Sequence, residues 1–254
     1  MGTINFINIG SGSKGNASFF YDGETLIQFD MGLSLKSINS GLSKLNLSSK
    51  DINAIFITHN HDDHVKTLCT LKDKDIYARK DILKPELKYI QIKPLQEICI
   101  GKFKILPFNS SHDAPKSVNY IIYYGNLKLA YVTDTGVIKK SAERLLINCD
   151  MYYFESNYDI EMLHNSGRPL FLIERIEGPQ GHLGNEQAAS YLAHFIGEKT
   201  QKIYLAHLSE ECNTEQLALN TIRFKFNDVG VYFPEDNLIA TKQREVTYGE
   251  IYEY

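Results

Sequence analysis

The residues best suited to chemistry in this sequence follow an apolar, β-branched run at positions 54–58. The next six positions, 59–64, read His-Asn-His-Asp-Asp-His. Successive side chains of an extended strand point to opposite faces, so His59 and His61, two positions apart, point to the same side. Two neutral imidazoles at one strand end can therefore bind the same cation.

The second half of this motif points to a second cation. Asp63 and His64 come after the chain has turned into a polar, helix-competent segment, so they approach from a different direction. Imidazole and carboxylate ligands suit zinc, manganese and iron. A surface turn rich in histidine and aspartate is the alternative interpretation, and it would account for any one of these histidines. Three histidines and an aspartate at a single strand end favour a metal site.

Three more residues of these chemical types come just after apolar, strand-like segments further along the chain: His112, Asp134 and His207. A carboxylate has two oxygens, so Asp134 is the residue type that can bridge two metal ions. We expect these strand ends to lie at one edge of the fold, where the three residues would meet the 59–64 motif at one site.

Strands with short connections must position these side chains. We predict strands at 3–9, 17–21, 25–29, 54–58, 76–78, 89–92, 98–100, 103–108, 118–124, 127–132, 151–154 and 203–206. Helices are predicted at 33–45, from 159, at 185–195 and at 215–226. Edge strands are expected around 229–233 and 238–241, whereas 164–185 reads as a polar connection and 248–254 receives no role.

Two turns at strand ends each admit two interpretations. The Gly-Ser-Gly-Ser-Lys-Gly-Asn loop at 10–16 fits a hairpin turn, or its backbone N–H groups with Ser13, Lys14 and Asn16 cradle an anion. Asp30 either orients a ligand histidine or caps a turn.

Composition indicates a globular protein without a membrane span. The 254 residues are 43% hydrophobic and 23% charged, and no apolar stretch approaches the length of about 20 residues that a membrane helix needs. The N-terminus has no basic region or cleavage site, so we expect a cytoplasmic location.

A net charge of −4 gives no overall basic footprint for nucleic acid, although bound cations add local positive charge. The four cysteines lack Cys-X-X-Cys pairing and are expected to be reduced core residues.

The His-X-His-X-Asp-His pattern after a strand resembles the signature motif of the metallo-β-lactamase superfamily. This resemblance implies an α+β fold, a four-layer αββα sandwich, in a single domain over residues 1–254 with no inserted domain. It also implies two divalent metal ions, zinc, manganese or iron, that share a hydroxide and carry out hydrolysis. Transferred residue by residue, the resemblance assigns the first ion to His59, His61 and His112. It assigns the second ion to Asp63, His64 and His207. Asp134 bridges the two ions.

Several motifs together resemble one branch, the YycJ/WalJ family of bacterial 5′→3′ DNA exonucleases. They are the 10–16 loop, the 59–64 motif, Ser-His-Asp-Ala, Thr-Asp-Thr-Gly, Glu-Ser-Asn, Gly-His-Leu-Gly-Asn and His-Leu-Ser-Glu-Glu-Cys-Asn. The resemblance covers residues 4–215 and implies DNA as substrate. Family members tend to be more basic between the Glu-Ser-Asn and Gly-His loops, whereas here Glu174 stands beside Arg175.

In phosphodiesterase branches of the superfamily, a histidine between the fourth and fifth ligands assists the leaving group. The resemblance implies this general-acid role for His182, with Glu155 as its partner; capping of the following helix is the alternative. Asp63 joins them in the predicted catalytic set. The predicted substrate contacts are Ser13, Asn16 and Asn157.

Two other functions fit parts of the same pattern. One is a small-molecule hydrolase acting on a cyclic phosphodiester, a lactone or a thioester. The other is a non-catalytic regulatory module that keeps a structural metal site. The complete ligand set favours catalysis, because a degenerate module would normally have lost a ligand. The sequence specifies neither the native metal nor the oligomeric state.

Overall fold

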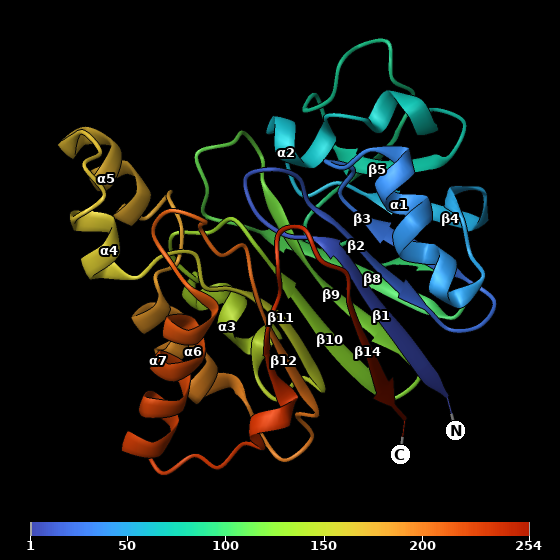
Figure 1. Cartoon of the computed structure of the whole chain (residues 1–254). Coiled ribbons are helices and arrows are strands. Elements are labelled where there is room, and N and C mark those ends of the chain that lie inside the picture. The colour runs from blue at the N-terminus through green and yellow to red at the C-terminus, as the bar shows by residue number, and fades with distance from the viewer. Residues whose placement is uncertain (1, 254) are drawn as a thin grey trace. The chain divides into compact units, whose positions relative to one another are not determined.

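The structure is a computed structural model that describes residues 2–253, and it divides into two compact units. The first comprises Met1–Asn109, Ala114–Leu127 and Lys242–Tyr254, and the second comprises Ser110–Asp113 and Lys128–Thr241. Figure 1 shows the first unit mostly in blue and green and the second mostly in yellow and orange. The single domain over 1–254 stays a prediction.

A mixed sheet of seven strands forms the first unit, in the order β14-β1-β2-β3-β4-β5-β6. Its strands are β1 (Thr3–Gly10), β2 (Ala17–Tyr21), β3 (Leu26–Phe29), β4 (Ile52–Phe56), β5 (Asp75–Arg79), β6 (Ile90–Ile92) and β14 (Thr247–Tyr252). Pairing is antiparallel from β14 to β3 and parallel from β3 to β6. Parallel neighbours need crossover connections, which here contain α1 (Leu35–Leu42), η1 (Ser43–Leu45), η2 (Ser49–Asp51), α2 (Asp62–Val65) and η3 (Leu68–Leu71).

Strand β4 is buried on both faces, which explains its nearly continuous apolar sequence. Ile55 belongs to an aliphatic cluster that includes Ile38 of α1. The next residue, Phe56, stacks on Phe29 of β3 and on Tyr77 of β5, with ring centroids 5.5 and 4.8 Å apart. Packing on both sides therefore fixes the carboxyl end of β4.

Three antiparallel strands complete the first unit: β7 (Ile98–Ile100), β8 (Phe103–Asn109) and β9 (Val118–Tyr124). Tyr120 of β9 packs edge-on against Phe29 and Phe56. Its hydroxyl donates a hydrogen bond of 2.6 Å to the carbonyl of Ile57, just past β4. This contact ties β9 to the segment that leads into the 59–64 motif.

The second unit contains four parallel strands in the order β13-β12-β11-β10. They are β10 (Leu127–Val132), β11 (Met151–Glu155), β12 (Lys202–Ala206) and β13 (Leu238–Ala240). Its helices are α3 (Lys140–Leu146), α4 (Ile160–His164), α5 (Leu170–Glu177), α6 (Asn185–Phe195), α7 (Glu215–Asp228) and η4 (Glu235–Asn237). Because the strands are parallel, the ends of β10, β11 and β12 lie at one edge of the sheet.

The predicted edge strand around 229–233 is wrong. Helix α7 ends there in a left-handed glycine turn, with Gly230 at φ 71° and the amide of Val231 bonded to the carbonyl of Phe226 at 2.8 Å. A glycine in this conformation is a common way to end a helix. Among the described elements of five residues or more, three were not predicted: α3, α5 in the 164–185 connection and β14 in the tail. Among residues 2–253, no helix is long and apolar enough to cross a membrane.

Candidate metal centre

The 59–64 motif gathers three histidines at the end of β4. His59 and His61 lie in the loop after the strand rather than on it, and the ring centroids of these two residues are 4.6 Å apart. His64 is on α2, as predicted, and its ring lies 4.0 Å from that of His59. Asp63 precedes it in the first turn of this short helix. The structure therefore brings together all four predicted ligands of the first unit.

Asp30 orients His64. It follows β3 directly in a left-handed conformation (φ 60°), and its Oδ2 lies 2.8 Å from His64 Nδ1. Oδ1 accepts hydrogen bonds from the amide and the hydroxyl of Thr58. Burial raises the pKa of Asp30, and the charge and hydrogen bond of His64 act in the opposite direction. With Nδ1 held by Asp30, Nε2 is the nitrogen of His64 that is suited to a metal.

The 10–16 loop joins β1 to β2 and packs its Asn16 against the motif. The backbone amide of Asn16 donates to the carbonyl of Asp63 at 2.8 Å, and its side-chain amide donates to Asp63 Oδ2 at 3.1 Å. Gly32 makes a similarly close approach, because a Cβ there would lie 1.7 Å from the carbonyl oxygen of Asp63. Ser13 is exposed on this loop. Substrate binding by Asn16 and Ser13 stays a prediction.

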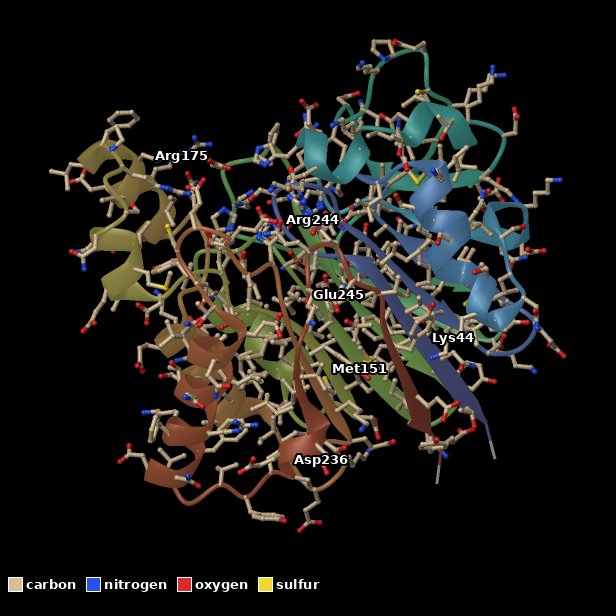
Figure 2. The ribbon with its side chains drawn as sticks, viewed as in Figure 1. Lys44, Met151, Arg175, Asp236, Arg244 and Glu245 are labelled. Carbon is tan, nitrogen blue, oxygen red and sulfur yellow. The ribbon has the colours of Figure 1, made fainter. Side chains whose placement is uncertain are left out.

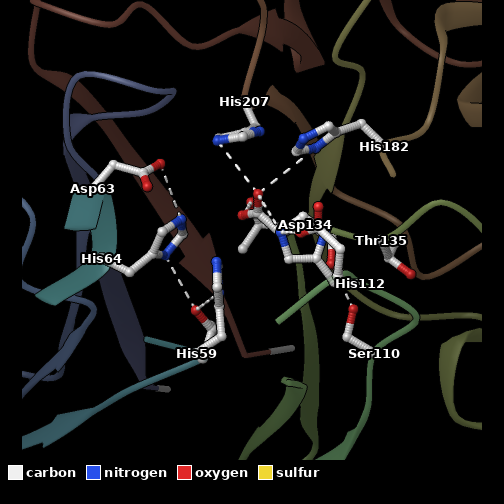
Figure 3. Close-up of polar contacts among 12 residues, drawn as sticks. His59, Asp63, His64, Ser110, His112, Asp134, Thr135, His182 and His207 are labelled. Carbon is white, nitrogen blue, oxygen red and sulfur yellow. Dashed lines mark hydrogen bonds and ion pairs between the residues drawn. The ribbon is translucent and has the colours of Figure 1, made fainter. Parts of the chain in front are cut away.

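Asp134 is the centre of the second group of predicted site residues. Its Oδ1 lies 3.5 Å from His207 Nε2 and 3.7 Å from both His112 Nε2 and His182 Nδ1 (Figure 3). Thr133 donates a hydrogen bond of 2.7 Å to the other carboxylate oxygen. Asp134 is buried and has a left-handed backbone, with φ 50°.

These distances fit a shared divalent ion better than direct hydrogen bonds. An N–H···O bond spans about 2.7–3.2 Å. Two ligand atoms each about 2.1 Å from a tetrahedral cation lie roughly 3.4 Å apart. The separations of 3.5 and 3.7 Å around Asp134 Oδ1 are close to the second value. Ligand atoms of Asp134, Glu155, His182 and His207 also lie within 4.8 Å of one another, a spacing compatible with a metal ion.

Hydrogen bonds orient the histidines of this group. His207 follows β12 in a left-handed conformation (φ 56°), and its Nδ1 lies 3.1 Å from Glu155 Oε1. Asn157 fixes the backbone by donating to the carbonyl of His207 at 2.7 Å. His112 Nδ1 lies 3.1 Å from the carbonyl of Gly181. In both histidines Nδ1 is engaged and Nε2 faces Asp134, the arrangement expected for metal-binding imidazoles. Substrate binding by Asn157 stays a prediction.

Glu155 connects the histidines. Its Oε1 lies 2.7 Å from His182 Nδ1, and its Oε2 accepts from the amides of Thr135 (2.8 Å) and Leu183 (3.3 Å). Burial alone would raise the pKa of Glu155, but the charge and hydrogen bond of His182 and the hydrogen bond of His207 outweigh it. The pKa of this carboxyl group therefore lies below its usual value. An ionised Glu155 accepts the Nδ1–H of His182 and leaves Nε2 for chemistry.

A family model, the beta-lactamase superfamily domain, matches residues 30–207, from the Asp that orients His64 to the last predicted ligand. The chain belongs to the metallo-β-lactamase superfamily. Exodeoxyribonuclease YycJ of Bacillus anthracis is 33% identical over 227 residues, covering 85% of this chain and 86% of that protein. Exodeoxyribonuclease WalJ of Streptococcus pneumoniae strain D39 is 33% identical over 228 residues, covering 84% and 85%. The predicted YycJ/WalJ branch is confirmed.

The fold prediction is also confirmed. The crystal structure of the metallo-β-lactamase fold protein YhfI from Bacillus subtilis matches with a TM-score of 0.70 and covers 97% of this chain and 100% of that one. At 18% identity this likeness concerns the fold alone. The chain thus has the predicted α+β fold, the αββα metallo-β-lactamase sandwich. Metal-dependent hydrolase is the enzyme class that these findings support.

Sequence reasoning missed a polar network of buried side chains around the loop that follows β11. The buried Asn213 side chain donates to the carbonyls of Ser156 and Asn157 at 2.9 and 3.1 Å, and Ser156 donates to Asn185 at 2.7 Å. These contacts fix the loop after β11. The sequence feature that could have indicated this network is the asparagine at the end of each of two motifs: Asn185 in Gly-His-Leu-Gly-Asn and Asn213 in His-Leu-Ser-Glu-Glu-Cys-Asn.

A second missed contact joins α5 to the residue after His112. Arg175, labelled on α5 in Figure 2, donates from Nε to Asp113 Oδ2 at 2.6 Å. Because Asp113 follows His112 directly, this ion pair helps to hold the His112 loop. Arg175 is therefore engaged within the protein, whereas the sequence suggested only that the segment was less basic than usual.

Proposed function

We propose that this chain is a metal-dependent exonuclease that hydrolyses the phosphodiester bonds of DNA from a 5′ end. The observation that carries the proposal is the contact between His182 and Glu155 beside Asp134, in a chain similar to YycJ and WalJ exodeoxyribonucleases. We further propose that residues 1–254 act as one domain, without an inserted domain, in the cytoplasm.

Two divalent ions, zinc, manganese or iron, would be held by the seven predicted ligands: His59, His61, Asp63, His64, His112, Asp134 and His207. When bound, such ions supply Lewis acidity and lower the pKa of a water molecule. The protein contributes the orientation of its ligands. Asp30, Glu155 and the carbonyl of Gly181 hold the Nδ1 atoms of His64, His207 and His112.

His182 would protonate the oxygen of the departing nucleotide. Its side chain is 21% exposed, whereas Glu155 is fully buried, so the pair runs from the interior to the surface. The ionised carboxylate accepts Nδ1–H, so Nε2 is the nitrogen of His182 that can carry the transferred proton. Asp63 would act in the catalytic set through its position next to His64.

Substrate contacts are proposed for three residues around these groups: Ser13, Asn16 and Asn157. Ser13 is exposed and can reach a phosphate directly. Asn16 and Asn157 are buried against Asp63 and the backbone of His207, so their first effect would be on ligand position.

Digestion of end-labelled DNA tests this function. Purified protein with manganese or zinc should shorten a strand stepwise from its 5′ end, and Asp134→Asn should abolish the shortening. A lactone, a thioester and a cyclic phosphodiester should remain intact in parallel reactions. Hydrolysis of one of these while DNA stays whole would replace the nuclease with a small-molecule hydrolase. No hydrolysis of any substrate by metal-loaded protein would favour a non-catalytic module.

A further inference from the structure

A cluster of basic residues follows the metal motif, although the whole chain is acidic. Between residues 65 and 93 there are eight lysines and arginines against four aspartates and glutamates, whereas the whole chain has 27 against 31. Most of these basic side chains are exposed, including Lys66, Lys80 and Lys93. Within residues 2–253, none of these three makes an ion pair with an acidic residue. Their positive charge is thus available to an external anion.

Strand geometry places two of these lysines beside the motif. β4, β5 and β6 are parallel neighbours, so their carboxyl ends lie at the same edge of the sheet. The end of β4 leads to His59, the end of β5 leads to Lys80, and the end of β6 leads to Lys93. Neighbouring strands are about 4.8 Å apart. The two lysines therefore extend from His59 in a row along the carboxyl edge of β4, β5 and β6.

Lys116, in the turn before β9, joins this row. Its Nζ donates to the carbonyl of Lys80 at 2.9 Å, and it lies 3.5 Å from Asp81 Oδ2. Two residues later, the amide of Val118 bonds to the carbonyl of Thr58 at 3.0 Å, next to His59. Lys116 is 43% exposed at its side chain, and Asp81 is the one acidic group in contact with it in the described chain.

We infer that Lys80, Lys93 and Lys116, called here the edge lysines, bind the phosphate backbone of a nucleic-acid strand beyond the bond that is cut. This inference rests on the proposed nuclease function and specifies where its substrate lies. A row of exposed cations about one strand apart suits a regularly spaced polyanion, whereas a small neutral ester would gain nothing from it. Binding of this kind depends on charge and not on base sequence.

Charge reversal of the edge lysines tests the inference. The variant K80E/K93E/K116E is compared with wild type and with K36E/K140E/K199E, which changes the same charge at exposed lysines elsewhere. Binding of a fluorescent single-stranded DNA is measured by anisotropy with EDTA, at several salt concentrations. We expect the edge variant to bind at least about tenfold more weakly. The slope of the logarithm of the binding constant against the logarithm of the salt concentration should become smaller in magnitude by about 2, because each phosphate contact with a single strand contributes roughly 0.7.

Three outcomes decide the matter. Weaker binding and a smaller salt slope in the edge variant alone would support the inference, provided that its melting temperature and metal content match those of wild type. If the two variants bind DNA with equal affinity while wild type digests DNA, the proposed role of the edge lysines is wrong and the proposed nuclease function stands. Wild-type protein that neither binds nor digests DNA would overturn both.

Discussion

Glu155 and His182 form a hydrogen-bonded pair of 2.7 Å between a buried carboxylate and a partly exposed imidazole. The same carboxylate oxygen lies 3.1 Å from Nδ1 of His207, a predicted metal ligand. One residue at the end of β11 thus orients both a proposed acid and a ligand. This arrangement requires the ends of β11 and β12 to be adjacent, which their parallel pairing provides.

Replacement of His182 by alanine should leave metal binding intact and slow DNA hydrolysis by roughly 10²–10⁴-fold, the usual contribution of a general acid. A bis-p-nitrophenyl phosphodiester should be affected much less, because its leaving group needs no proton. The comparison of the two substrates is the measurement. His164→Ala is the matched control, since His164 also contacts a carboxylate, Glu177, on the surface. Equal losses on both substrates would exclude the acid role.

Asp134→Asn should remove most of the bound metal and lower activity by at least about 10³-fold. Asparagine tolerates the left-handed conformation of Asp134 and can still accept the hydrogen bond of Thr133. The substitution therefore tests the loss of the negative charge alone. Metal content by mass spectrometry after gel filtration is the direct measurement. Melting temperature should rise on metal addition in wild type and hardly at all in the variant. Full metal content with normal turnover would refute the bridging role.

The sequence was most informative where strand period and turn residues agreed. Strands 17–21, 118–124 and 127–132 and helix 185–195 were predicted with the boundaries that the structure has. It was least informative in the tail. β14 has no apolar alternation that marks a strand, and it forms because β1 offers it a free edge, a relationship that only the folded sheet contains.

The ligands could be identified from the sequence, but the groups that orient them could not. A histidine after a strand has a recognisable type and position. The choice of Asp30 as partner of His64 instead depends on two positions 34 residues apart, one just after β3 and the other on α2. The left-handed conformations of Asp30, Asp134 and His207 are likewise properties of tertiary packing. Such strained residues are common at functional sites.

Thiol reactivity should divide the four cysteines into two pairs. Cys69 and Cys99 are exposed, contrary to the expectation that all four lie in the core, whereas Cys149 and Cys212 are buried. Burial raises the pKa of Cys149 to about 12, so its thiolate is scarce at pH 8. Native protein should therefore react with two equivalents of a thiol reagent, and denatured protein with four. Rapid reaction of four in the native state would contradict the buried positions.

Asp30→Asn should weaken metal binding by about 10–100-fold, the usual effect of removing a group that supports a ligand histidine. Asparagine preserves size and tolerates φ 60°, but a neutral amide oxygen holds the Nδ1–H of His64 less strongly than a carboxylate. Competition with a chromogenic chelator measures the affinity. The exposed Asp73→Asn provides a control that removes the same charge from the same unit. If the two variants bound metal equally well, Asp30 would have only a turn-capping role, the alternative that its place after a strand first suggested.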